Sequence, residues 1–158
     1  MDFRELQDRY KAEQRKVTED KIIVGGLFRT ILSTNDGLKF KDGRTSKPKR
    51  MIIVGIDKTT KTCYGTVLVN TKMSPLAQVS PQYFATQYCL KQKNYPEYLD
   101  YDSYVDCGVL FAISFDTLKS GEYYGTLNAN DTAAIFDILE TTKAISTKDK
   151  KRFNIRRR

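Results

Sequence analysis

Residues 50–71 run RMIIVGID (50–57), KTTK (58–61) and TCYGTVLVNT (62–71), and this stretch decides which fold is expected. The first run is rich in Ile and Val, which is typical of a buried strand, and the third partly alternates apolar and polar side chains. A short polar turn between two such runs favours antiparallel pairing. The sequence therefore predicts a β-hairpin here.

Strand and helix patterns continue on the C-terminal side of this hairpin. Residues 103–115 are rich in apolar side chains, and residues 123–127 form a shorter run that contains Gly125; both are expected to be strands. Residues 128–146 are expected to form a helix, because Asn130 can cap it and apolar residues recur on one face. That face consists of Ala134, Ile135, Ile138 and Leu139.

The N-terminal side begins with a polar helical pattern. Good helix formers dominate residues 2–20, and neither Gly nor Pro interrupts them. The apolar stripe of this pattern consists of Phe3, Leu6, Tyr10 and Val17. Because the stripe is too narrow for a core helix, we expect the helix to pack on the surface of the domain or on a partner. An apolar segment at 22–32, a turn cluster at 33–37 and a basic loop at 39–49 then lead into the hairpin.

Residues 74–102 differ from the rest of the chain, since they contain three of its four prolines and six aromatic residues. Prolines limit long regular elements, so we expect at most a short helix at 82–92. Together these patterns predict a mainly β fold of the α+β class. Its core would be a small antiparallel barrel or strongly bent sheet, with an N-terminal and a C-terminal helix.

Length and composition are those of one folded domain. The chain has 158 residues, 40% of them hydrophobic and 29% charged, which excludes a mostly disordered chain and allows a real core. No apolar run approaches the roughly 18 residues that a membrane span needs, and the charged N-terminus lacks the apolar run of a signal peptide. We therefore expect a soluble, cytoplasmic protein that does not enter a membrane.

Cysteine and histidine usage excludes several catalytic classes. The three cysteines, Cys63, Cys89 and Cys107, show no CxxC spacing, and we expect them to be buried thiols in a reducing compartment. The chain has no histidine, which removes Ser–His and Cys–His nucleophile pairs and the usual ligand set of zinc. We expect neither a metal nor a cofactor.

Positive charge is concentrated in two short segments. Residues 39–50 carry six basic side chains and one acid, and residues 148–158 carry seven basic side chains and one acid, whereas the whole chain has a net charge of +8. The remainder of the chain is therefore mildly acidic. Two separate basic blocks favour a polyanion partner, above all a nucleic acid, with an anionic membrane or a purely solubilising tail as alternatives.

Four segments follow one another in an informative order. The first is DGR at 42–44 and KPKR at 47–50, directly before MIIVG, and the second is VLVNT at 67–71. The third contains YVDC and LFAI within 104–113, and the fourth is GTL at 125–127, followed by Asp131, Ile135 and Leu139. This order resembles the PemK/MazF-like family of toxin–antitoxin ribonucleases. The resemblance implies an SH3-like or CcdB-like barrel over residues 21–146, with an aromatic-rich insertion at 75–102. Residues 1–20 would be a helical extension and residues 147–158 a basic tail.

The resemblance also implies a reaction and the residues that carry it. Members of the family cut single-stranded RNA without a metal, by attack of the 2′-hydroxyl on the adjacent phosphate. Arg50, or Lys49 if the register shifts by one residue, would take the place of the family's arginine as electrostatic stabiliser and candidate acid. Thr71 would orient the phosphate. The basic residues that would line the path of the RNA backbone are Arg44, Lys47 and Lys72.

Several assignments stay open. Asp36 is either the proton acceptor or a turn residue, and the tyrosines within 83–104 either stack on unpaired bases or pack in the core. The expected partners are single-stranded RNA, an acidic antitoxin protein and a second copy of the chain in a homodimer. The main alternative is a non-catalytic member of the same barrel superfold that binds RNA or protein, and a further one is a gyrase-directed inhibitor on the related barrel.

Overall fold

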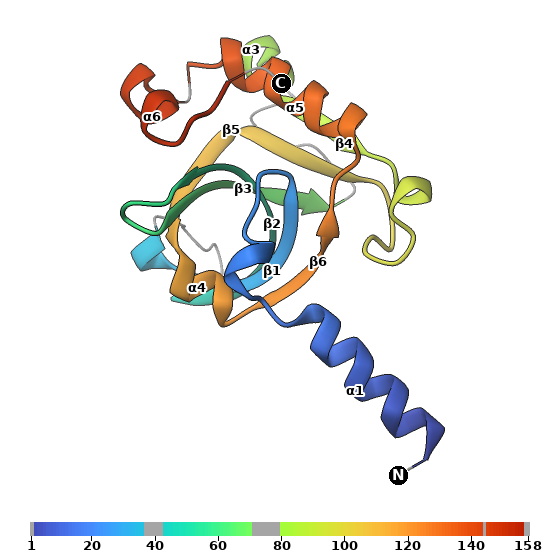
Figure 1. Cartoon of the computed structure of the whole chain (residues 1–158). Helices are drawn as coiled ribbons and strands as arrows, with labels where there is room; N and C mark the ends of the chain where they lie inside the picture. The colour runs from blue at the N-terminus through green and yellow to red at the C-terminus, as the bar shows by residue number, and fades with distance from the viewer. Residues whose placement is uncertain (1, 37–42, 71–79, 144, 157–158) are drawn as a thin grey trace.

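A six-stranded antiparallel sheet forms the centre of the protein in the computed structural model, which describes residues 2–36, 43–70, 80–143 and 145–156 (Figure 1). The strands are β1 (Gly26–Ser33), β2 (Ser46–Asp57), β3 (Thr62–Asn70), β4 (Gln87–Leu90), β5 (Ser103–Ser114) and β6 (Glu122–Thr126). They lie in the order β4-β5-β3-β2-β1-β6. The predicted antiparallel α+β fold is thus confirmed. Within the described residues the sheet is open, because no pairing joins its edge strands β4 and β6.

Helices precede and follow the sheet, as predicted for the two ends of the chain. They are α1 (Phe3–Arg15), α3 (Pro81–Phe84), α4 (Phe115–Lys119), α5 (Ala129–Thr141) and α6 (Thr147–Arg152). Single 3₁₀ turns lie at Glu19–Lys21, Thr34–Asp36 and Gln92–Asn94. Among the residues described, no helix has the length and apolar character needed to cross a membrane.

The predicted hairpin is present as β2 and β3, with Asp57 paired to Thr62 at the turn. Asp57 shapes this turn, because its Oδ1 accepts hydrogen bonds from the backbone amides of Thr59 (3.0 Å) and Thr60 (3.3 Å). Local sequence signals therefore suffice to place this part of the sheet.

β2 begins four residues earlier than the sequence indicates, at Ser46 rather than Arg50. The added residues pair with β1, as far as Ser33 opposite Ser46, so the prediction of a loop there is wrong. Pro48 is tolerated because it lies at the end of β2 where the described pairing with β3 has not yet begun. Residues 39–42 of the predicted basic loop lie outside the described part of the chain.

Two helix predictions are corrected by the structure. The short helix at 82–92 is wrong: α3 is a single turn, and β4 replaces the second half because it pairs with β5 at the edge of the sheet. The C-terminal helix ends at Thr141, and its cap is Asn128 rather than Asn130. Asn128 Oδ1 accepts a hydrogen bond from Asp131 N at 2.8 Å.

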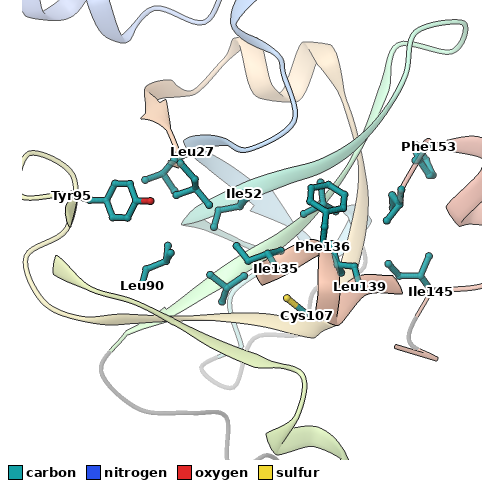
Figure 2. Close-up of a cluster of buried hydrophobic side chains, with 14 of the residues drawn as sticks. Leu27, Ile52, Leu90, Tyr95, Cys107, Ile135, Phe136, Leu139, Ile145 and Phe153 are labelled. Atoms are coloured by element: carbon teal, nitrogen blue, oxygen red, sulfur yellow. The ribbon is translucent and has the colours of Figure 1, made fainter. Parts of the chain in front are cut away.

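Apolar side chains pack on both faces of the sheet. On one face α5 contributes Ile135, Phe136 and Leu139, and the segment after α6 contributes Phe153 (Figure 2). Of the predicted apolar face of the helix, Ile135 and Leu139 are therefore buried. Phe136, which is not part of that predicted face, is buried as well. The second cluster includes Phe28, Leu32, Met51, Ile53, Phe115 and Leu118.

All three cysteines are free thiols. Cys63 and Cys107 are fully buried, as predicted, whereas Cys89 is half-buried. Burial raises the pKa of the Cys63 and Cys107 thiols to about 12, so both stay protonated at neutral pH. These two cysteines are therefore packing residues rather than nucleophiles.

The C-terminal tail folds back onto the β2–β3 hairpin. Phe153 is 1% exposed, its ring stacks on Tyr64 with 4.7 Å between centroids, and its carbonyl accepts a hydrogen bond from Ile56 N at 3.1 Å. Gly55 makes this approach possible, since a Cβ there would lie 2.6 Å from Phe153 Cβ. Ile155 is buried as well. These two apolar side chains anchor the tail.

Basic side chains of the tail also contact the rest of the protein. Arg152 Nε lies 3.0 Å from Asp57 Oδ2. Lys150 Nζ donates hydrogen bonds to the carbonyls of Glu140 (2.8 Å) and Thr142 (3.1 Å) at the C-terminal end of α5. Part of the tail's positive charge therefore has a structural role.

The Asp57–Arg152 pair predicts a pH-dependent contribution to stability. The hydrogen bond from Arg152 lowers the pKa of Asp57 to about 2, whereas an aspartate in the unfolded chain has a pKa of about 3.9. The stabilisation is therefore present above about pH 4 and is lost as the pH falls towards about 2. We expect Asp57→Asn to melt below wild type at neutral pH and to approach it in acid.

Thermal melts followed by circular dichroism from neutral to acidic pH check this expectation. Asp100→Asn, at an exposed aspartate in the loop before β5, is the matched control and should follow wild type throughout. A constant difference in melting temperature between wild type and Asp57→Asn over the whole range would contradict the role given to the pair.

Candidate nucleic-acid interface

The sequence does not decide whether Lys49 or Arg50 takes the place of the arginine. In the structure these two residues lie on opposite faces of β2. Side chains alternate along a strand, and the register with β1 pairs Arg50 with Arg29 and Lys49 with Thr30. Thr30 is 2% exposed, and its hydroxyl donates to the carbonyl of Thr117 at 2.8 Å. Lys49 therefore shares the face that α4 covers, whereas Arg50 shares the other face with Arg29.

A row of charged residues crosses three strands on the face that Arg50 occupies. Arg29 of β1 is paired with Arg50 of β2 on one side and with Glu122 of β6 on the other. Directly opposed residues of an antiparallel pair have Cβ atoms roughly 5 Å apart, so these three side chains are neighbours. We call Arg50, Arg29 and Glu122 the arginine row.

Two tyrosines lie beside the arginine row. The register between β1 and β6 shifts at a β-bulge, which leaves Tyr124 between the paired residues of β6. The Tyr124 ring lies 6.3 Å from the ring of Tyr98, whose backbone carbonyl accepts a hydrogen bond from Arg50 Nη1 at 3.4 Å. Gly125 permits this approach, since its φ is 143° and a Cβ there would lie 2.8 Å from the Tyr98 ring.

A groove of about 740 Å³ opens between α1 and β6, next to these tyrosines. Its walls include Tyr10 of α1 together with Tyr98 and Tyr124. Arg15, the last residue of α1, lies over the Tyr124 ring at 5.4 Å and has its Nη1 4.0 Å from Glu122 Oε2. The groove thus combines aromatic faces with a guanidinium group beside the arginine row.

The hydroxyls of Tyr98 and Tyr124 stay protonated at neutral pH. Burial raises the pKa of Tyr124, the nearby Glu122 carboxylate adds to this effect, and two nearby arginines oppose it. Burial also raises the pKa of Tyr98, with a further contribution from Glu97. These hydroxyls can donate hydrogen bonds, and Glu122 is the carboxylate of the row that can accept a proton.

Asp36, the other candidate proton acceptor, holds a turn. Its Oδ2 accepts hydrogen bonds from Ser33 N (2.7 Å) and from Ser33 Oγ (3.2 Å) at the end of β1. Of the two roles that the sequence leaves open for Asp36, the structure therefore supports the turn residue.

The predicted site residues are not all gathered at the arginine row. Arg44 is exposed in the segment before β2. Lys47 is half-buried and shares a face with Lys49, because the two lie two positions apart on the strand. Outside the described residues lie Thr71 and Lys72.

Arg29 and Glu122 are the members of the row that the sequence does not single out. Arg29 is a lone cation within the apolar segment 22–32, and Glu122 stands at the start of a short strand. A charge inside an apolar strand pattern is a weak signal for a functional position. Only the register of β1 with both of its neighbours shows that these residues meet.

Two tyrosines within 83–104 support the fold rather than the groove. Tyr88 and Tyr95 both donate hydrogen bonds to the buried carboxylate of Asp131. Burial, and then the Asp131 carboxylate, raise the pKa of Tyr88 to about 12. This network ties the chain around β4 to the first turn of α5, and Tyr98 is the tyrosine of this segment that lines the groove.

Neither a scan against protein-family models nor a search of curated proteins finds a match for this chain. The case for a function therefore rests on the arginine row and the groove.

Proposed function

We propose that this chain is a metal-independent endoribonuclease of the PemK/MazF type, which cleaves single-stranded RNA by attack of the 2′-hydroxyl on the adjacent phosphate. The observation that carries the proposal is the cross-strand pairing of Arg50 with Arg29 beside the rings of Tyr98 and Tyr124. Guanidinium groups match phosphate oxygens in a bidentate manner and remain charged. Aromatic faces stack on unpaired bases, which single-stranded RNA offers.

The proposal includes the SH3-like or CcdB-like barrel that the family resemblance implies. The segment between β4 and β5 supports it, because Tyr98 packs against Gly125 of β6 and so links the surroundings of the two edge strands. The strands also curve strongly around a common centre (Figure 1). Such curvature brings β6 and the chain after β4 together next to Arg50.

In the proposed reaction, Arg50 and Arg29 stabilise the charge that develops on the phosphorane, and Glu122 accepts the proton of the 2′-hydroxyl. The O2′–P bond forms as the P–O5′ bond breaks, and the leaving O5′ takes a proton from water. The products are a 2′,3′-cyclic phosphate and a 5′-hydroxyl end. The role of Thr71 in orienting the phosphate stays a prediction. The same holds for the RNA-backbone contacts of Arg44, Lys47 and Lys72.

A cytoplasmic location, a homodimer and control by an acidic antitoxin belong to the same proposal. Exposed basic residues of the tail are complementary to an acidic protein, and they are Lys148, Lys151 and Arg156. Pull-down of the full chain with an acidic peptide at low and high salt measures this attraction, which should weaken as ionic strength rises.

Glu122→Gln is expected to lower the rate of RNA cleavage by about 10²–10⁴-fold, because a positioned proton acceptor contributes that much. The variant keeps the size and hydrogen-bonding capacity of the side chain but cannot take up the 2′-hydroxyl proton. Initial rates of cleavage of a fluorescently labelled single-stranded RNA measure the effect.

The matched control is Glu97→Gln, which changes a carboxylate that borders the groove but lies outside the row. This variant should keep the wild-type rate. A Glu122→Gln protein with an unchanged rate would show that Glu122 does not accept the proton.

A non-catalytic RNA-binding role is the second candidate, and one observation favours it. The Glu122 carboxylate raises the pKa of the nearby Tyr124 and lies 4.0 Å from Arg15, so it also fits a purely structural role in a binding surface. RNA binding that weakens steeply with salt, without cleavage under any condition, would support this candidate over the ribonuclease.

A further inference from the structure

An apolar stripe on α1 is largely exposed to solvent. Phe3, Leu6 and Tyr10 are 75%, 53% and 68% exposed, and α1 projects from the sheet (Figure 1). Lys11 and Arg15 line both hollows between α1 and β6, and Tyr10, at the C-terminal end of the stripe, borders the larger of these two hollows. At about 100° per residue, the centre of the stripe lies about 110° around the helix from Lys11 and about 150° from Arg15. From this stripe we infer that α1 pairs with α1 of a second copy of the chain, in an antiparallel arrangement.

Among the described residues, the hydrogen bonds and ion pairs that join α1 to the rest of one copy involve its C-terminal end. The 13 residues of the helix bury no side chain. Lys21 Nζ donates to the carbonyls of Gln14 (2.9 Å) and Lys16 (2.8 Å), and Arg15 reaches Glu122 and Tyr124. Isolated helices of this length are marginal in water, because nucleation is costly. A second helix against the stripe would supply the missing burial.

The stripe has the spacing of a helix-pairing seam. Phe3, Leu6 and Tyr10 are separated by three and four residues, as in the a and d positions of a heptad. An antiparallel two-fold axis at the middle residue sets Leu6 opposite its own equivalent and Phe3 opposite Tyr10 of the second copy. The seam is then self-complementary, as a two-fold interface requires.

Charge along α1 favours the antiparallel over the parallel arrangement. Residues 2–8 carry three acids and one base, whereas residues 9–16 carry four bases and one acid. In an antiparallel pair each acidic half lies beside the basic half of the other copy, while a parallel pair would set like charges together. Asp2 and Arg9 flank the stripe at equivalent heptad positions and would meet across the antiparallel seam.

The association of the full chain tests the inference, and it does not depend on RNA cleavage. Sedimentation equilibrium should show a dimer for wild type, and Leu6→Glu should raise the dissociation constant by about tenfold or more. Ala12→Glu adds the same charge to an exposed position on the other side of α1 and should dimerise as wild type does. A monomeric wild type, or a dimer that Leu6→Glu leaves intact, would overturn the inference.

Engineered cysteines test the orientation of the two helices. Under mild oxidation Leu6→Cys should form a disulfide-linked dimer, and a mixture of Phe3→Cys with Tyr10→Cys should link to each other. Phe3→Cys alone should remain unlinked beyond the level of wild type, whose own three thiols set the background. Efficient self-linking of Phe3→Cys would indicate a parallel pair and overturn the antiparallel arrangement.

Discussion

Arg50→Ala is expected to reduce RNA cleavage by about 10²–10³-fold, the usual cost of one preorganised donor to a developing oxyanion. Lys49→Ala should leave the rate close to that of wild type, because alternation along β2 turns its side chain to the opposite face. Arg50→Lys keeps the charge but loses the guanidinium fork, so its cleavage rate should lie between the rates of Arg50→Ala and Lys49→Ala. Initial rates on one labelled single-stranded RNA, under identical conditions, measure all three variants.

Lys49→Ala is the matched control for Arg50→Ala, because each variant removes one cation and the two positions are neighbours on the same strand. Circular dichroism and melting temperature establish that each variant is folded. If Lys49→Ala abolished cleavage while Arg50→Ala retained it, the arginine row would not be the catalytic face and the family's arginine would correspond to Lys49.

Phe153→Ala is expected to lower the free energy of unfolding by about 3–5 kcal/mol, the usual cost of removing a buried aromatic side chain. Phe153 is 1% exposed and stacks on Tyr64, so truncation leaves a cavity between the tail and the β2–β3 hairpin. Urea denaturation followed by circular dichroism measures the change as a shift of the transition midpoint.

Lys151→Ala is the matched control for Phe153→Ala, because it truncates an exposed side chain two residues away. It should leave the midpoint of the urea transition nearly unchanged. Gly55→Ala probes the same contact from the other side, since its Cβ would lie 2.6 Å from Phe153 Cβ, and should also destabilise. A midpoint of Phe153→Ala equal to that of wild type would show that the tail does not pack on the hairpin in solution.

The parts of the fold that the sequence predicts are those specified by neighbouring residues. The β2–β3 hairpin follows from two β-rich runs and a polar turn, and its turn is held by Asp57 and the amides that follow it. The start of β2 at Ser46 and the strand β4 are missed, because both depend on pairing with strands distant in sequence. Propensity within a window of residues carries no information about such partners.

The residues of the candidate site also divide into those that the sequence predicts and those that only the strand pairing reveals. Arg50 is found from its motif, but the choice between Arg50 and Lys49 needs the register of β2 with β1. Arg29 and Glu122 join the row through pairings on both sides of β1, and they are far apart in the sequence. Tyr98 reaches the row only because Gly125 leaves room for its ring.

Charge counting also has a limit that the tail illustrates. The seven basic residues of 148–158 indicate a polyanion partner, yet Lys150 caps α5 and Arg152 pairs with Asp57. Net charge does not distinguish a cation that caps the end of a helix from a cation that binds a ligand. The exposed positions of the tail are the ones available to a partner.

End-group analysis of cleaved RNA tests the central proposal most directly. The full chain is incubated with a long single-stranded RNA in EDTA, and the cut is mapped. We expect 5′-hydroxyl and 2′,3′-cyclic phosphate ends, and no cut in the same RNA with a single 2′-deoxy substitution at the mapped position. Ends carrying a 5′-phosphate, cleavage of the substituted strand, or no cleavage by the folded wild-type protein would contradict it.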